Sequence, residues 1–301
     1  YSKILSLLKD KNLVYYTNAL INLGVSYSDL SEIRDKEEYV GLAINTYQEA
    51  LKVHTFEKFP QDYAKTQMTL GNAYGGLSEV RDKEANLGLA INAHHEALKV
   101  FIFDKFNQDY AQTQMCLGNA YRNLSEIRDK EVNLEHSLKA FHESLKIYTF
   151  EKSPQDSART QMNLGNAYRD LSEIRDKEVN LEHSLKAFHE SLKTYTFGKF
   201  PQGYAMTQMS LGNAYGSLSA VRDKEANLGL AIEAFNKSLK IYTFEKFPQY
   251  YALAQMNLGN AYRSLSEVRD KEANLGLAID VFNKSLKIYI FEKFPQYYAM
   301  T

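Results

Sequence analysis

The chain has 301 residues, of which 44% are hydrophobic and 24% charged, a composition typical of a folded soluble protein. Its 36 basic and 37 acidic residues nearly cancel, so it lacks the positive field that attracts nucleic acid or an anionic membrane surface. The single cysteine, Cys116, excludes an intramolecular disulfide framework, and no stretch approaches the roughly 20 apolar residues that span a bilayer, so we expect a cytoplasmic protein.

The pentapeptide Leu-Gly-Asn-Ala-Tyr recurs five times, each copy 47 residues after the previous one, and a degenerate copy begins at Leu23. Runs of Arg-Asp-Lys-Glu and several prolines keep the same interval. Self-similarity at a fixed period of about 20 to 50 residues is the signature of a repeat architecture. We therefore predict one quasi-linear array rather than two globular domains. The five intact copies begin at Leu70, Leu117, Leu164, Leu211 and Leu258.

The predicted repeats follow one another without linkers. Residues 1–16 are expected to hold the end of a preceding helix, and residues 299–301 begin a further repeat that stops at once. Since both ends fall inside a repeat and no polar capping helix follows, we expect either a longer parent protein or end-to-end self-association through the open termini. The six complete repeats are 17–63, 64–110, 111–157, 158–204, 205–251 and 252–298.

Each repeat is predicted to begin with a helix, named helix A. In the second repeat its apolar residues mostly share one stripe of a helix instead of alternating as in a strand. Pro60 stands just ahead of this stripe, and proline suits a first helical turn because the first amides of a helix have no internal partner. The stripe consists of Met68, Leu70, Tyr74 and Leu77.

A second helix, named helix B, is predicted after the polar run Arg81-Asp82-Lys83-Glu84. Its apolar stripe extends from Leu87 to Phe101. Asn86 is placed to cap its start by accepting hydrogen bonds from exposed backbone amides. Asparagine returns at the same register in four later repeats, as Asn133, Asn180, Asn227 and Asn274.

Small residues predict how the two helices meet. Gly71 and its equivalents each cost about 1 kcal/mol relative to alanine inside a helix, so their recurrence in all six repeats indicates a packing requirement. Helix B offers alanine or serine at one register, for example Ala90 and Ser137. We expect these small surfaces to lie against each other and to let the helix axes approach closely.

Together these residues resemble the tetratricopeptide repeat (TPR) family, and the resemblance covers residues 17–298. Two features depart from the family pattern. Glutamine, Gln208 in the fifth repeat, stands where tryptophan is common, and the repeat is longer than the usual 34 or so residues. Such elongated repeats are similar to those of kinesin light chains and of bacterial signalling proteins that join repeat arrays to protease or nucleotide-binding modules. The matching residues of the fifth repeat are Leu211, Gly212, Tyr215, Ala231, Phe235, Ser238 and Pro248.

The resemblance implies an all-α, right-handed superhelical solenoid whose helices A line a concave groove. That groove would carry one asparagine per repeat, and similar asparagines grip peptide backbone in the family. A side-chain amide offers both a donor and an acceptor to an extended peptide. Alternatively, the same asparagines bond neighbouring helices or water. This asparagine ladder consists of Asn72, Asn119, Asn166, Asn213 and Asn260.

Two further sets of residues are candidates for the groove. One methionine per repeat would give an adaptable apolar lining, although packing between adjacent helices A is an equal alternative. Arginines one turn beyond the ladder would favour an acidic peptide, although charged helix faces are usually only solvated. These residues are Met68, Met115, Met162, Met209 and Met256, with Arg122, Arg169 and Arg263. Methionine replaces the lysine that a carboxylate clamp requires, which disfavours a heat-shock chaperone tail.

Catalytic and metal-binding patterns are missing from the sequence. The seven histidines fall on or near helix B without a His-Glu-x-x-His motif, and the Arg-Asp-Lys-Glu turn lacks the glycines of a phosphate loop. We therefore predict a non-enzymatic interaction scaffold, without cofactor or metal, that binds a protein or peptide. A regulatory or sensor arm of a larger signalling protein and a self-assembling structural array stay open as alternatives.

Overall fold

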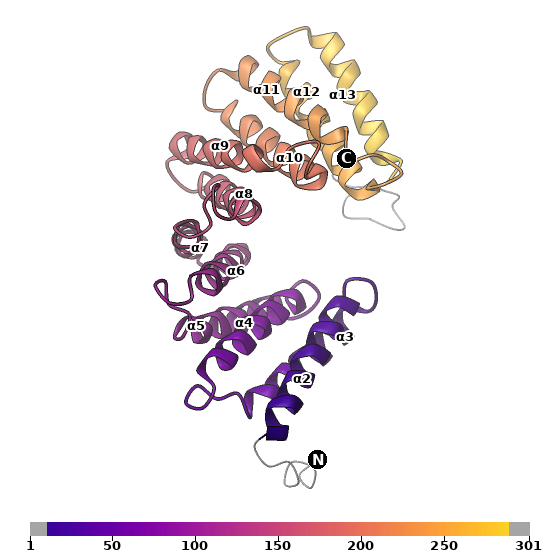
Figure 1. Cartoon of the computed structure of the whole chain (residues 1–301). Helices are drawn as coiled ribbons and strands as arrows, with labels where there is room; N and C mark the ends of the chain where they lie inside the picture. The colour runs from indigo at the N-terminus through magenta and orange to yellow at the C-terminus, as the bar shows by residue number, and fades with distance from the viewer. Residues whose placement is uncertain (1–10, 289–301) are drawn as a thin grey trace. The chain divides into compact units, whose positions relative to one another are not determined.

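The structure is a computed structural model that describes residues 11–288, and every regular element in that range is an α-helix. The predicted all-α class is therefore confirmed, whereas the predictions for residues 1–10 and 289–301 lie outside the described residues. Helices A and B alternate along the chain (Figure 1). Helices A are α2 (Lys11–Leu30), α4 (Pro60–Leu77), α6 (Asn107–Ser125), α8 (Pro154–Leu171), α10 (Pro201–Leu218) and α12 (Pro248–Leu265). Helices B are α3 (Lys36–Leu51), α5 (Lys83–Leu98), α7 (Lys130–Leu145), α9 (Lys177–Thr194), α11 (Lys224–Leu239) and α13 (Lys271–Leu286).

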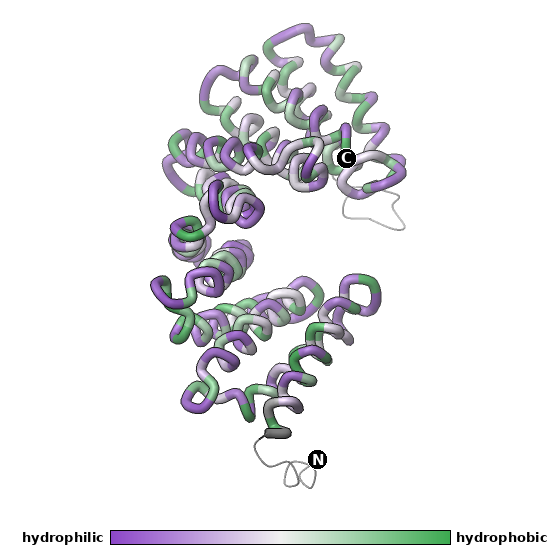
Figure 2. The backbone as a smooth tube through the Cα atoms, viewed as in Figure 1, coloured by the Kyte–Doolittle hydropathy of each residue, from purple (hydrophilic) through white to green (hydrophobic). Residues whose placement is uncertain are grey.

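The chain divides into two compact units, Tyr1–Tyr148 and Thr149–Thr301. Within each unit, every helix A packs against its own helix B, and each helix B packs against the next helix A. Successive helices A also touch directly, α4 with α6 in the first unit and α10 with both α8 and α12 in the second. Figure 2 shows apolar and polar residues interleaved along each helix, as expected for helices that bury one stripe.

Proline starts four of the six helices A, as predicted. The prolines occupy the first helical position, where the missing amide hydrogen removes no helical hydrogen bond. The third repeat has Asn107 at this position, and α6 begins there without proline. Proline thus favours the start of helix A but is not required for it.

The glycine that recurs in each helix A leaves room for an aromatic ring of helix B. A Cβ atom at Gly118 would lie 2.6 Å from Cε1 of Phe141, far inside van der Waals contact. Phe141 is fully buried there. The predicted contact between small residues is also present, because the Ser137 hydroxyl donates to the carbonyl of Gly118 at 2.8 Å.

The start of helix B differs from the prediction. Asn133 is buried as the fourth residue of α7, and its Nδ2 donates to the Arg128 carbonyl at 2.8 Å instead of accepting from backbone amides. The N-cap is Asp129, whose φ of 44° lies in the left-handed region. Equivalent Asn-to-Arg hydrogen bonds and left-handed aspartates recur in four other repeats, at Asn86, Asn180, Asn227 and Asn274 with Asp82, Asp176, Asp223 and Asp270.

The first repeat lacks the buried asparagine near the start of helix B, and its N-cap has a different conformation. Tyr39 replaces it, Asp35 then has a φ of −57°, and its carboxylate accepts from the Glu38 amide at 3.0 Å in an ordinary cap. The left-handed N-cap therefore accompanies the asparagine, which ties the preceding turn to the helix.

The Arg-Asp-Lys-Glu turns form ion pairs between neighbouring repeats. Arg128 pairs with Glu84 at 3.0 Å in the first unit, and Arg222 pairs with Glu178 at 2.8 Å in the second. All four side chains are about half exposed. Such exposed pairs each contribute about 0 to 1 kcal/mol, so each adds little to the stability of the fold.

Candidate functional site

A hollow lies on the helix A face of the second unit, where α8, α10 and α12 run side by side. Its volume is about 460 Å³, and the side chains of Leu228 and Phe235 from α11 form its floor. Two asparagines of the predicted ladder, Asn213 and Asn260, line it together with Arg169. The structure therefore brings three of the predicted site residues into one depression.

The first unit has a second hollow of about 310 Å³ on its own helix A face. Val40 and Tyr47 of α3 form its floor, and Asn72 of the ladder lines its wall. Eight of its lining positions match those of the other hollow after a shift of four repeats. The matched pairs are Val25 with Asn213, Ser28 with Gly216, Val40 with Leu228, Tyr47 with Phe235, Thr69 with Asn257, Asn72 with Asn260, Ala73 with Ala261, and Gly76 with Ser264.

The ladder asparagines differ in how far they are available to a ligand. Asn72 and Asn260 are exposed, and Asn119, Asn166 and Asn213 are half-buried. Asn213 Oδ1 accepts a hydrogen bond from Asn257 Nδ2 of the next helix A at 3.1 Å. Asn213 therefore bonds a neighbouring helix, as in the alternative interpretation of the ladder. Its own amide hydrogens are not used in this bond and can donate to a ligand.

Asn257 is a site residue that the sequence analysis missed. It lies three positions before Asn260, so both side chains point to the same side of α12, and both line the hollow. The same register carries a polar or small side chain in the earlier repeats, at Thr69, Cys116, Asn163 and Ser210. That recurrence is the signal that would have identified it.

Four of the five methionines are buried. Met115, Met162, Met209 and Met256 expose 3%, 6%, 8% and 6% of their surface, and only Met68 is half-buried. Met209 belongs to the core cluster that contains Leu228 and Leu258. The packing alternative therefore describes these four side chains, and little of their surface is left for a partner.

The three arginines have different surroundings. Arg169 exposes 21% of its side chain and pairs with the adjacent Asp170 at 3.0 Å. Arg122 is half-buried, and Arg263 is exposed near the end of α12. Among these three arginines, the most exposed positive charge is therefore in the sixth repeat.

The phenols near this face stay protonated at pH 7. Burial raises the pKa of Tyr168 and of Tyr215 above the ordinary value of 10. The Tyr215 hydroxyl also lies 3.2 Å from His189 Nε2, which links α10 to the preceding helix B. Their role in the described structure is to connect helices.

Residues 11–288 contain no group of three or more histidine, cysteine, aspartate or glutamate side chains arranged to hold a metal ion. None of the helices in the same range combines the length and the apolar character needed to cross a bilayer.

A scan against protein-family models and a search of curated proteins each found no match. Solved structures match over most of the chain. BtubC (BKLC) from P. vanneervenii matches with a TM-score of 0.52 and 16% identity, over 90% of this chain and 91% of that one. The S. pombe nuclear import adaptor Nro1 matches with a TM-score of 0.51 and 13% identity over 97% of each chain. The apo form of RapI matches with a TM-score of 0.50 and 16% identity, over 89% of this chain and 74% of that one.

These neighbours are TPR-type proteins. At identities of 13% to 16%, the similarity concerns the fold alone. It agrees with the consecutive helix pairs of this chain. The chain therefore has the fold of a helical repeat array, consistent with TPR-like repeats.

Proposed function

We propose that this chain is a non-enzymatic scaffold that binds an extended segment of another protein along its helix A face. The observation that carries the proposal is the hollow that recurs at the same register in both units, with a ladder asparagine in its wall each time. A surface with the same shape and polar groups at regular intervals suits an extended peptide, whose backbone donors and acceptors also recur at regular intervals.

The hollow of the second unit offers complementary groups to a peptide backbone. Asn213 has free amide hydrogens, and the exposed Asn260 can donate and accept. A Cβ atom at Gly216 would have no neighbour within 4 Å, so this wall is open to close approach by a chain. Backbone contacts of this kind bind a peptide with little dependence on its sequence, and side-chain pockets add the selection.

The charge on this face favours a ligand with acidic residues toward the sixth repeat. Arg263 is exposed there, whereas the charge of Arg169 is already shared with Asp170. An acidic side chain near Arg263 would gain a charge-assisted hydrogen bond in competition with Glu267, which lies four residues further along the chain.

A peptide library displayed on phage tests the proposal. Peptides selected on the full chain would be titrated against the double variant Asn213→Ala/Asn260→Ala and against a matched control, Asn236→Ala/Asn283→Ala. The control changes two exposed asparagines of helices B that are also one repeat apart. We expect the ladder variant to bind at least about tenfold more weakly, or about 1.4 kcal/mol, and the control to bind within about twofold of the parent.

Thermal unfolding of each variant checks that the fold is kept, since Asn213 also bonds Asn257. Equal affinities for the parent and the ladder variant, or an equal loss in the control, would show that the selected peptides bind elsewhere.

A further inference from the structure

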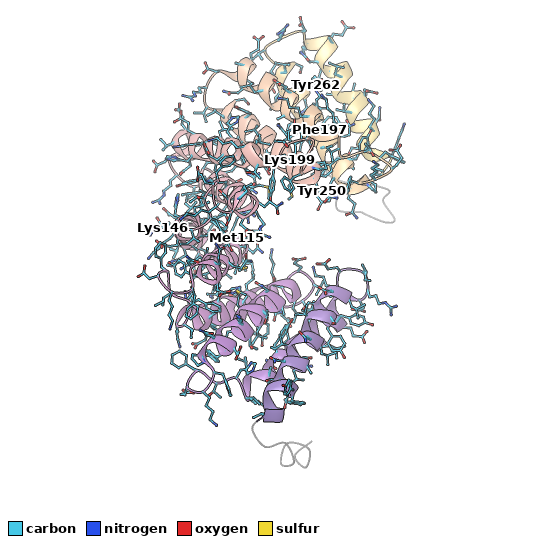
Figure 3. The ribbon with its side chains drawn as sticks, in the orientation of Figure 1. Met115, Lys146, Phe197, Lys199, Tyr250 and Tyr262 are labelled. Atoms are coloured by element: carbon cyan, nitrogen blue, oxygen red, sulfur yellow. The ribbon has the colours of Figure 1, made fainter. Side chains whose placement is uncertain are left out.

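A larger cavity of the second unit lies away from the helix A hollows. Its volume is about 1100 Å³, and it is formed where the turns after helices B meet the first residues of helices A. The turns over residues 195–200 and 240–247 make two of its sides, and the N-terminal parts of α8, α10 and α12 make the others. Figure 3 labels three of its lining residues, Phe197, Lys199 and Tyr250.

One glycine distinguishes this place from the equivalent turns of the other repeats. Gly203 occupies the register at which the three preceding repeats have aspartate, at Asp62, Asp109 and Asp156. A Cβ atom at Gly203 would lie 2.9 Å from Cδ2 of Tyr195, so any side chain would displace that ring. Both residues line the cavity. Glycine at this register therefore lets the Tyr195 ring lie against the backbone of α10, and it removes a carboxylate.

The cavity walls are largely aromatic. Tyr242 and Tyr250 stack with their ring centroids 4.8 Å apart and their planes 18° apart. Phe247 meets Tyr242 edge to face at 5.6 Å, and on the other side Phe200 meets Tyr195 edge to face at 5.8 Å. Fixed rings of this kind offer flat apolar surfaces to another planar group.

The charged residues of the lining are all cations, namely Arg159, Lys199, Lys240 and Lys246. Arg159 pairs with Asp156 at 2.7 Å, so its charge is compensated. The three lysines are exposed and have no carboxylate partner among the described residues. Their uncompensated charge lies beside the aromatic walls, a combination that attracts an anion with an apolar body.

We propose that this cavity binds a small organic anion with a planar aromatic body, its ring against the tyrosine and phenylalanine walls and its acidic group among Lys199, Lys240 and Lys246. The volume lies slightly above the roughly 300 to 1,000 Å³ typical of small-molecule sites. Glycine occurs at this register of the lining in one repeat only. A peptide that crosses several repeats would use a recurring feature, whereas a single cavity suits a small molecule.

Two fluorescent naphthylamines test this site. The anionic probe 1-anilinonaphthalene-8-sulfonate and its neutral analogue N-phenyl-1-naphthylamine share the aromatic body and differ in the charged group. Each would be titrated against the full chain, the variant Lys199→Gln/Lys246→Gln and the control Lys58→Gln/Lys152→Gln. The control removes the same two charges at the same register of other repeats.

We expect the anionic probe to bind the parent and the control alike, and to bind Lys199→Gln/Lys246→Gln about fivefold more weakly or worse. The neutral probe should bind all three alike. Gly203→Asp and Gly203→Asn introduce side chains of nearly equal size, so each should weaken the binding of both probes. Aspartate should weaken the binding of the anionic probe further, because it also adds a negative charge.

Equal binding of the anionic probe to the lysine variant and to its control would overturn the proposal. Equal weakening of anionic-probe binding by Gly203→Asp and by Gly203→Asn would also overturn it. Circular dichroism of each variant confirms that the helices are kept. The variant Asn213→Ala/Asn260→Ala should bind the probe as the parent does, so this result is independent of peptide binding on the helix A face.

Discussion

His94 makes the stability of this protein depend on pH in a way that one substitution should remove. It is the single imidazole at a register that otherwise carries Tyr47, Phe141, Phe188, Phe235 and Phe282. The ring exposes 2% of its surface, packs against Gly71, and has a buried Nδ1 without a hydrogen-bond partner. Burial, reinforced by the charge of the adjacent His95, lowers the pKa of His94 from its ordinary 6.5 to about 4.

The sign of the effect follows from proton binding. Below pH 6.5 the unfolded chain binds a proton at this imidazole, and the native protein does not bind it until about pH 4, so acidification favours unfolding. The shift of about 2.5 pKa units, at about 1.36 kcal/mol each, corresponds to a loss of about 3 kcal/mol that is complete below pH 4 and absent above pH 7.

The variant His94→Phe restores the residue of the later repeats and should lose this dependence. We expect its advantage in free energy of unfolding over the parent to grow by about 2.5 kcal/mol between pH 7.5 and pH 4.5. Urea unfolding followed by far-ultraviolet circular dichroism measures it, with the exposed His183→Gln as the control for loss of an imidazole. Repeat arrays can unfold in steps, so hydrogen exchange of the backbone amides in α4 and α5 should be measured together with urea unfolding. Parallel curves for parent and variant would refute the reasoning.

Three further changes test the packing, each by urea unfolding at pH 7. Phe188→Ala empties the fully buried ring site beside Gly165 and should cost about 3 to 5 kcal/mol, with Phe188→Leu costing clearly less. Asn133→Asp cannot donate to the Arg128 carbonyl and should cost about 1 to 3 kcal/mol. It should cost more than Asn133→Ala, because its carboxylate oxygens face the carbonyl oxygen to which the amide donated. Asp129→Gly removes the strain of the left-handed φ of 44° and should raise the free energy of unfolding by about 0.5 to 1 kcal/mol, whereas Asp129→Val should lower it. A valine variant more stable than the glycine variant would contradict the left-handed conformation at this residue.

The period of the sequence predicted the order and the pairing of the helices. Each 47-residue interval carries two apolar stripes, a proline at the start of the first and a polar turn between them. These are local properties, and local hydrogen bonding and burial of one stripe decide helices. Gly118 and Ser137 also indicated a close contact between helices, and the structure contains it.

Which neighbour covers each side chain was less predictable. Asn133 has the sequence context of a helix cap, yet its register in α7 turns the amide back toward the Arg128 carbonyl. Met209 and Asn213 are one helical turn apart in α10, and the first is buried in the core while the second lines the hollow. Periodicity places both on nearly the same side of the helix, and only the position of the next helix A separates their roles.

The sequence by itself determined an all-helical repeat array, because a pattern repeated six times fixes the same local structure six times. The tertiary structure decided where that array has open surface. The hollow of the second unit lies where α8, α10 and α12 leave space above Leu228 and Phe235, and the Tyr195 ring of the aromatic cavity packs against α10 because Gly203 has no side chain. Open surface depends on the distances between side chains of different repeats, and those distances are set when the helices pack.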